Sequence, residues 1–388
     1  MAGNPWAGAT TSQWYVAETV AGVTPTAPIW NAFRYTGGIP AVTKDTLQSD
    51  ELDDSREITE IRTGNESAAG EFGIELSPGS YTAILENALR TTAEDGFTEL
   101  VVEITVDSTL KTFTRTSGDF VADGVSVGDL IRFSDLTGNN AAGFPVTAVT
   151  ALTVTGGAIT AELTDEVVTT DYTVADKYKT GSECKTISVL TWLRGRCGTV
   201  DKYLITRGVE ASGFSFEIAV NANVTGSFPL IGRSQITADT PPTGSTFLDA
   251  PTGRVFSGVD GKLLIDGEVQ GLVTSATITN DNSASPQYEL GDKSVSFVEI
   301  GRATNTVSLS AFMANFDLHD RFLEETETEI VIVLNGPGGV MSFTYPKVFL
   351  TASTPEIGGE TSITQTLEGT ATGNKQQSSI IIQEIVYS

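Results

Sequence analysis

Short runs in which apolar residues alternate with polar or small ones recur along most of the chain. The clearest run contains Phe72, Ile74 and Leu76, with a polar or small residue beside each. A β-strand places successive side chains on opposite faces, so this pattern predicts strands with one buried face. The 39 glycines in 388 residues and the frequent threonines also suit strands and turns better than helical bundles. The sequence therefore predicts a mainly β protein, long enough for two or three domains.

Two short segments depart from this alternation and have helical spacing. Over residues 80–92 the apolar residues fall at i, i+3, i+4, i+7 and i+8, which predicts an amphipathic helix. The segment 317–325 has two apolar residues at i and i+4, which predicts a second helix. Each helix follows an alternating strand, at 70–76 and at 307–312. This shared order of elements predicts one β unit that is used twice.

Changes in composition divide the chain further. Residues 1–45 mix glycine, proline and scattered aromatics and are predicted to form an N-terminal arm, whose aromatics pack on their own domain or on a neighbouring subunit. The short strands of residues 97–180 predict an inserted small β domain, and the proline-rich segment 237–258 has linker composition. The two tandem β units then comprise residues 46–96 with 181–236, which form a discontinuous first unit, and residues 259–388, which form the second.

The charge of the chain limits its partners. Forty-nine acidic residues against 23 basic ones give a formal net charge of -26, so an ordinary face of this protein repels phosphate, heparin and anionic lipid. No apolar run approaches the ~20 residues that span a bilayer, and the first residues lack the pattern of a signal peptide. We therefore expect a soluble protein that stays in the cytosol, without sequence-specific nucleic-acid binding or membrane contact.

Few residues are available for catalysis. The chain has one histidine, His319, predicted to lie on the surface of a short helix, and two cysteines, Cys184 and Cys197, predicted to be ordinary reduced residues. No nucleotide, dinucleotide or zincin motif occurs, and the glycine-rich stretch 335–339 predicts a hairpin loop rather than a phosphate cradle. We expect neither enzyme activity nor a cofactor.

Acidic clusters could form two further kinds of site. The Asp-Gly pairs at Asp260 and Asp266 predict turns, because they lack the spaced ligands of a calcium loop, and we expect no metal site. Paired carboxylates can also hydrolyse glycosides, which leaves a glycosidase as a minor hypothesis. The adjacent pairs are Asp50-Glu51, Asp53-Asp54 and Glu324-Glu325.

Two groups of short motifs follow one another along the chain. The first comprises Glu51–Ile58, Arg62–Gly64, Gly70–Leu76 and the predicted helix at Tyr81–Leu89. The second comprises Ser275–Asn280, Tyr288–Gly291, Val307–Phe312, Tyr345–Val348 and Pro355–Gly359. In this order, over roughly residues 45–96, 181–235 and 260–370, the chain resembles the major tail tube proteins of long-tailed, siphovirus-like bacteriophages in their two-unit form.

The resemblance implies a fold and a function. It implies two tandem tail-tube-type β-sandwich or barrel units, each with a short flanking α-helix, plus the inserted all-β domain. It implies a structural virion protein whose copies form rings, three per ring when each chain carries two units, and the rings stack into a tube for DNA delivery. In the family an N-terminal arm and a long hairpin loop make contacts between rings. The insert departs from the family pattern, because it lies inside the first unit rather than at the C-terminus.

The resemblance also implies partners and a location. The partners are other copies of the chain and other tail proteins, namely the tape measure, tail terminator and distal tail proteins, while DNA passes through the lumen without specific binding. The protein is expected in the tail tube of the virion, after assembly in the host cytoplasm. The alternative from a different class is a non-enzymatic multidomain β protein for host or carbohydrate recognition. That alternative requires exposed aromatics in residues 97–180, whereas the phenylalanines there occupy core-like positions.

Carboxylates on a channel wall would keep a polyanion such as DNA from adhering. Glu71 and Glu75 are candidates for this lining, because they point away from the apolar face of the strand that contains Phe72 and Ile74. Glu217 is a further candidate. Solvated glutamates on an outer face are the alternative for all three.

Overall fold

The computed structural model describes residues 6, 8–51, 58, 60–134, 136, 143–157, 163–195, 200–357, 362–374 and 376–387, with the backbone alone at 100–102. The described part is mainly β, as predicted, with two short α-helices. None of its helices has the length and apolar composition of a membrane span.

The first β unit is built around a helix that follows a long strand. Its elements are β1 (Ser12–Ala17), β2 (Ile29–Ala32), β3 (Ala41–Gln48), β4 (Ile61–Glu75), α1 (Thr82–Leu89), β11 (Asp176–Lys179), β12 (Ile187–Leu193), β13 (Lys202–Ala211), β14 (Gly213–Ala219), β15 (Thr225–Gly232), β16 (Ser234–Ala238) and β17 (Thr246–Leu248), with a 3-10 turn at Gly8–Thr10. Between α1 and β11 the chain forms a separate barrel.

The second unit repeats the arrangement. Its elements are β18 (Gly261–Ile265), β19 (Glu268–Gln270), β20 (Val273–Asp281), β21 (Ser285–Gln287), β22 (Phe297–Glu299), β23 (Thr304–Phe312), α2 (Asp317–Leu323), β24 (Thr328–Gly336), β25 (Gly339–Glu356), β26 (Thr364–Ala371) and β27 (Ile381–Val386), preceded by a 3-10 turn at Gly258–Asp260. The glycine-rich stretch 335–339 is the tight β24-β25 turn, as predicted.

The strand pairings confirm that one unit is used twice. In the first unit the order β3-β4-β15-β14 forms one sheet, and β1-β12-β13-β16 forms another. In the second unit β20-β23-β26-β25 and β18-β24-β25-β27 have the same connectivity. One long segment changes sheets in each unit: β25 does so within a single strand, and its counterpart is interrupted at Ser212 into β13 and β14.

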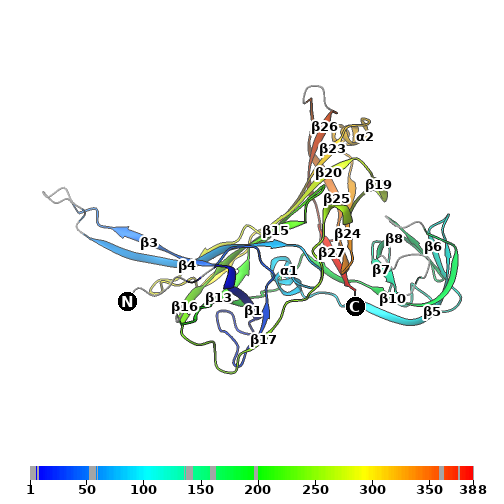
Figure 1. Cartoon of the computed structure of the whole chain (residues 1–388). Coiled ribbons are helices and arrows are strands. Elements are labelled where there is room, and N and C mark those ends of the chain that lie inside the picture. The colour runs from blue at the N-terminus through cyan, green and yellow to red at the C-terminus, as the bar shows by residue number, and fades with distance from the viewer. Residues whose placement is uncertain are drawn as a thin grey trace.

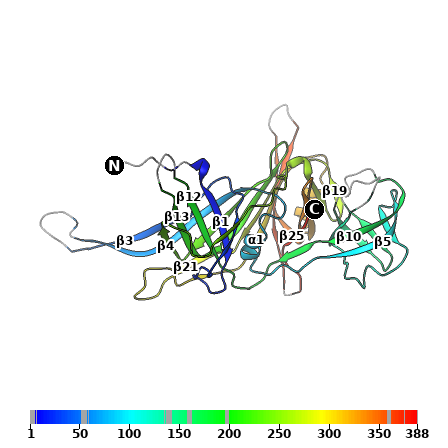
Figure 2. The ribbon, with the colours of Figure 1, turned by 60° about the horizontal axis from the view of Figure 1, so that its bottom comes forward.

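The two units share one continuous sheet. Strand β14 pairs antiparallel with β20, from Gly213 opposite Asp281 to Ala219 opposite Ser275. The resulting strand order is β3-β4-β15-β14-β20-β23-β26-β25, which we call the main sheet (Figures 1 and 2). Because hydrogen bonds cross the boundary between the units without interruption, the main sheet is a single surface.

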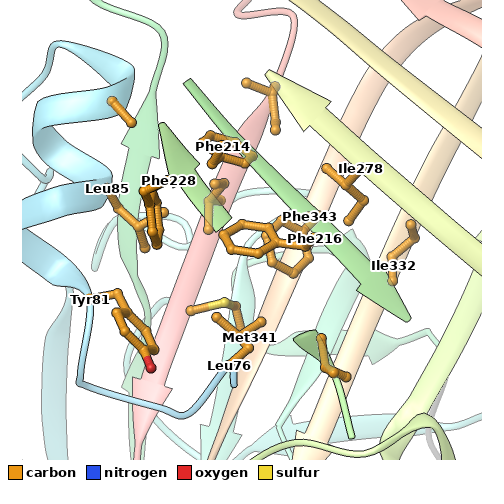
Figure 3. Packing of buried hydrophobic residues seen from close by; sticks show 14 of the residues in the cluster. Leu76, Tyr81, Leu85, Phe214, Phe216, Phe228, Ile278, Ile332, Met341 and Phe343 are labelled. Carbon is orange, nitrogen blue, oxygen red and sulfur yellow. The ribbon is translucent and has the colours of Figure 1, made fainter. Parts of the chain in front are cut away.

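The apolar face of the main sheet covers the core. Phe216, Phe228 and Ile278 pack there against Phe343 of the second sheet and against α1 (Figure 3). Gly226 lies beside Phe216 in the ladder, where a Cβ would come within 2.4 Å of the Phe216 ring. The position therefore requires glycine.

The two helices are shorter than the sequence predicts. Helix α1 ends at Leu89 because Arg90 adopts a left-handed conformation, φ 55°, which terminates the hydrogen-bond ladder. Its apolar stripe is buried as predicted, whereas α2 buries none of its residues completely.

Three of the aromatics near the N-terminus are buried within their own chain. Trp14, Trp30 and Phe33 are buried, and β1 pairs with β12 as a regular member of the first unit. Strand β17, inside the predicted linker, runs parallel to β2 and adds Phe247 to the same cluster. Packing within the chain, the first of the two expectations, is observed for Trp14, Trp30 and Phe33.

The segment between α1 and β11 forms a closed barrel. Its strands are β5 (Phe97–Asp107), β6 (Thr112–Arg115), β7 (Leu130–Phe133), β8 (Phe144–Val149), β9 (Thr153–Gly156) and β10 (Glu166–Val174). The phenylalanines at 113, 120, 133 and 144 are all buried inside it. This placement gives no support to a recognition surface built from these aromatics.

The barrel is attached firmly to the second unit, although it is inserted in the first. Gln383 of β27 accepts a hydrogen bond from Leu130 N–H at 2.8 Å and donates one to the Gly128 carbonyl at 2.7 Å. Tyr387 accepts a hydrogen bond from Gly143 N–H and donates one to Asn335. Apolar contacts around Leu130 complete the interface, so the barrel cross-links the two units.

Candidate functional site

The face of the main sheet that points away from the core is polar in its central part, from β4 across to β26. One ladder crosses it strand by strand, with each residue directly opposite the next. It runs Glu75, Thr225, Glu217, Thr277, Ser308 and Glu368. Residues directly opposite in a sheet project from the same face, so these side chains form one row across both units.

Neighbouring rows have the same chemistry. Two residues along each strand, the ladder runs Gly73, Ser227, Ser215, Thr279, Thr306 and Thr370. The serine and threonine side chains of this row are partly exposed. We call the surface made by these rows the polar face; small hydroxyl side chains keep it smooth and hydrated.

All charged side chains at the centre of the polar face are acidic. The sequences of β14, β15, β20, β23 and β26 contain neither lysine nor arginine. Glu217, Asp281 and Glu368 are exposed on them, and Glu71 and Glu75 lie on the adjoining strand β4. Carboxylates two strands apart are separated by about 10 Å, close to the Debye length at physiological salt, so their fields overlap. The polar face therefore repels a polyanion.

The predicted acidic candidates all lie on this face. Glu71 is exposed opposite Pro229, and Glu75 is half-buried and accepts a hydrogen bond from the Asn223 amide at 3.1 Å. Glu217 is exposed at the junction of the units. The structure thus brings the three residues onto one surface, which spacing in the sequence could not show.

Sequence reasoning missed Asp281 and Glu368. Asp281 ends the alternating segment that begins at Val273, and Glu368 alternates with the buried Leu367. Period-two alternation alone would have found both as outward-facing residues. Their membership of the same face depends on strand pairing between segments that are distant in the sequence.

A different carboxylate, Glu384, is buried away from the polar face. It lies on β27 opposite Asp176 of β11 and accepts a hydrogen bond from Gly79 N–H. Burial raises the pKa of Glu384 to about 7; the Gly79 hydrogen bond lowers that pKa and the nearby Asp176 charge raises it. Glu384, on the last strand, therefore contacts the turn before α1 through Gly79. It also lies opposite Asp176, just after the last strand of the barrel.

The barrel contains a buried charged group, the guanidinium of Arg115. Arg115 donates to Asp123, which also accepts a hydrogen bond from the Tyr172 hydroxyl at 2.8 Å. These two hydrogen bonds lower the pKa of Asp123. The guanidinium stacks over Phe120 at 4.9 Å, so the group is satisfied inside the barrel and has a structural role.

The remaining sequence candidates have ordinary surroundings. His319 is half-buried and hydrogen-bonded to Ser353 at 2.8 Å, so it is not the free surface residue predicted. Asp260 caps a 3-10 turn, and no group of three or more metal-ligating side chains occurs in the described ranges. Cys184 is an exposed free thiol. Cys197 and the pair Asp53-Asp54 lie outside the described residues.

Comparison with known families agrees with this geometry. A family model described as phage tail tube protein matches residues 8–371. The chain belongs to this family. The match covers both β units and the barrel, so the predicted resemblance is confirmed for nearly the whole chain. No curated protein sequence matches the chain.

Membership of the phage tail tube family identifies the chain as a structural component of a virion. The main sheet of this tail tube protein has one apolar face and one polar face. The apolar face is already covered within the chain. The polar face is uncovered within the chain.

Proposed function

We propose that this tail tube protein forms rings that stack into a tube, with the polar face lining the channel for DNA. The observation that carries the proposal is the continuity of that face across both units, with no lysine or arginine in the strands at its centre. Glu71, Glu75 and Glu217, together with Asp281 and Glu368, are then lumen residues. Their charge keeps the DNA mobile, because a wall without cations offers no phosphate contacts.

Free strand edges support ring formation. At one edge of the main sheet, β3 pairs only with β4 in the part of the chain that the structure describes. At the other edge, residues 349–356 of β25 pair only with β26 among those residues. Unpaired edges are ready to pair with another chain. Within the chain, β14 is the counterpart of residues 349–356, and β20 is the counterpart of β3. These two strands pair with each other, and their pairing is our model for the contact between subunits.

The repeated unit supports a ring of three copies. Each chain supplies two units with the same connectivity, so three chains make a pseudo-sixfold ring through one type of edge contact repeated around the axis. Each contact would join residues 349–356 of one copy to the edge at β3 of the next. Further copies stack axially, and the tape measure, tail terminator and distal tail proteins are the other partners.

We propose the same domain division as the sequence predicts, with the N-terminal arm packed into the first unit through β1, β2 and β3. The units span residues 46–96 with 181–236 and residues 259–388, the insert spans 97–180, the arm 1–45 and the linker 237–258. The hydrogen bonds of Gln383 with the barrel support a bracing role for the insert, on the side of the second unit away from the core. The function is non-enzymatic, and assembly takes place in the host cytoplasm.

Electron microscopy and native mass measurement of the purified protein test this proposal. We expect rings or hollow tubes, and a species with the mass of three chains at low concentration. A protein that stays monomeric at every concentration, also after addition of preformed tube ends, would contradict it. Glu217→Ala serves as a control that should leave assembly intact, because it removes only a charge on the lumen wall.

A further inference from the structure

The two helices occupy equivalent places in the repeated unit but have different surroundings. Each follows the strand that lies second in its half of the main sheet, β4 for α1 and β23 for α2. Helix α1 lies in the middle of the molecule, between the two units, whereas α2 lies at one end (Figure 1). Five of the eight residues of α1 are buried, and none of the seven residues of α2 is. The chain therefore covers one of its two helices and leaves the other open.

The difference is clear at the C-terminal end of each helix. Leu323, the last residue of α2, is 63% exposed. Ala88 holds the same place in α1, seven residues after the N-cap residue in both helices, and it is completely buried. Leu318 of α2 packs against the core, so the helix is held by its own unit while Leu323 is left uncovered.

The second unit supplies part of the cover of α1. Asn282, which follows β20, donates a hydrogen bond to the Ala88 carbonyl at 2.6 Å. Glu384 of β27 accepts a hydrogen bond from Gly79 N–H in the turn before the helix. Apolar residues of both units complete the cluster around α1. Helix α1 therefore fills the junction at which β14 of the first unit pairs with β20 of the second.

The strand ladders identify the counterpart of Asn282 in the first unit. Equivalent ladders cross three strands in each unit: Glu217, Thr225 and Glu75 in the first, and Glu356, Thr364 and Phe312 in the second. Six residues before Glu75, Ala69 lies opposite Ala41 of β3. Six residues before Phe312, Thr306 lies opposite Thr279 of β20. Ala41 and Thr279 are therefore equivalent, and three residues further on Lys44 is the counterpart of Asn282.

The inner face of β3 lacks the cover that β20 has. Val42 lies opposite the buried Ala68, so Val42 and Lys44 continue the apolar side of the main sheet. Val42 is 37% exposed, and the side chain of Lys44 is 54% exposed. Their counterparts on the second unit, Asn280 and Asn282, are each 3% exposed. The first unit therefore has an open position at the place where the second unit covers a helix.

We propose that α2 of one copy packs under the inner face of β3 of the next copy in the same ring, as α1 packs at β20 within the chain. The inference rests on the proposed function, because this contact forms beside the pairing of residues 349–356 with β3. Leu323 then lies beside Lys44 and near Val42 of the next copy. The contact gives the ring a second layer behind the strands of its channel wall.

The charges across this contact have opposite signs. Glu324 and Glu325 directly follow α2, are exposed and have no ion pair among the described residues. The carbonyl end of a helix also favours a cation. Lys44 pairs with Glu66 at 2.9 Å and is still half exposed, so its ammonium group is available to the helix end. At the internal junction the neutral Asn282 holds this place, so charge distinguishes the contact between copies from the contact within the chain.

Substitution on each side of the contact tests the proposal. Leu323→Asp and Lys44→Glu should each raise at least tenfold the protein concentration at which three-copy species form, by native mass measurement. The unfolding midpoint of the single chain should not change, because both side chains are exposed. Leu110→Asp, at a leucine of the barrel that is 65% exposed, is the matched control and should leave ring formation unchanged.

A charge exchange separates the helix contact from the strand pairing of β3. Adding Glu324→Lys and Glu325→Lys to the Lys44→Glu chain should restore ring formation, because the two surfaces again carry opposite charges. A defect that Lys44→Glu causes in the strand pairing alone would not be restored by changes at the end of α2, and that outcome would overturn the docking of α2.

A disulfide test locates the contact directly. In a background of Cys184→Ser and Cys197→Ser, a chain with both Lys44→Cys and Leu323→Cys is assembled and oxidised. We expect covalent species that end at three chains, since the ring closes, and none from a chain with Lys44→Cys and Leu110→Cys. Normal rings of Leu323→Asp, or rings without the cross-link, would overturn the docking of α2 but not the rings; wild-type protein without rings would overturn both proposals.

Discussion

At the scale of single residues, the two faces of the main sheet differ by side chains that alternate along each strand. On β14, Phe216 enters the core while Glu217 next to it is exposed. Close packing fixes the buried positions, and charge and hydration are all that constrain the exposed ones. Substitutions on the two faces should therefore have effects of different kinds.

Gly226 gives a test of the buried face. We expect Gly226→Ala to lower the free energy of unfolding by about 1–3 kcal/mol, because the added methyl group would clash with the Phe216 ring. Denaturant titration of the unassembled protein measures this. Ser227→Ala, one residue further on the polar face, should change it by less than about 0.5 kcal/mol. Equal effects of the two would contradict the assignment of faces.

Glu384 should make stability depend on pH. Its pKa is raised in the folded state to about 7, so the folded protein binds a proton that the unfolded chain has lost. Between pH ~4.5 and ~7 the stability that this group contributes is therefore lost as the pH rises, by up to about 3 kcal/mol.

The measurement compares the wild type with Glu384→Gln, which keeps an oxygen for the Gly79 N–H. The variant should gain stability relative to the wild type as the pH rises from 5 to 8. Glu217→Gln removes the same charge from an exposed position and should show no such trend. A difference between wild type and Glu384→Gln that stays constant with pH would rule out the buried titration.

At the scale of elements, the barrel is held by polar groups of β27 as much as by apolar contact. Gln383 is buried and satisfies both Leu130 N–H and the Gly128 carbonyl. We expect Gln383→Ala to lower the free energy of unfolding by about 2–4 kcal/mol, because the buried Leu130 N–H and the half-buried Gly128 carbonyl lose their partner.

Hydrogen exchange locates this effect. Exchange at residues 128–130 should accelerate in Gln383→Ala, while the barrel strands β6 and β9 keep their protection. Gln376→Ala, at an exposed position, is the control and should change neither region. If β6 and β9 lose protection to the same extent, the barrel does not fold as an independent unit.

The elements also show how far the sequence alone could lead. Local periodicity predicted the strand at Phe72 to Leu76, both helices and the strand-rich insert, because these signals come from neighbouring residues. The pairing of β14 with β20 and the change of sheets at Ser212 could not be predicted, since they depend on contacts between distant segments. Alternation along β4 predicted that Glu71 and Glu75 point away from the apolar face, whereas the position of Glu368 on the same surface depends on strand pairings between distant segments.

At the scale of the whole molecule, the net charge of -26 opposes assembly. Copies that approach one another repel at low ionic strength, and salt screens this repulsion as the Debye length falls from about 30 Å at 0.01 M to about 8 Å at 0.15 M. We therefore expect ring stacking to begin at a lower protein concentration in 0.5 M than in 0.02 M sodium chloride.

Sedimentation of tubes at several salt concentrations measures this dependence. A charge-neutral osmolyte at the same osmolality is the control for solvent effects. Stacking that weakens steadily with salt would show that ion pairs between copies outweigh the repulsion of their net charges.

The most direct test of the central claim is a cryo-electron-microscopy reconstruction of the assembled protein at a resolution that resolves side chains. We predict three chains per ring, with the main sheet around a channel and Glu217, Asp281 and Glu368 facing its interior. A tube in which these residues face the outer solvent, or a channel wall formed by the barrel, would contradict it.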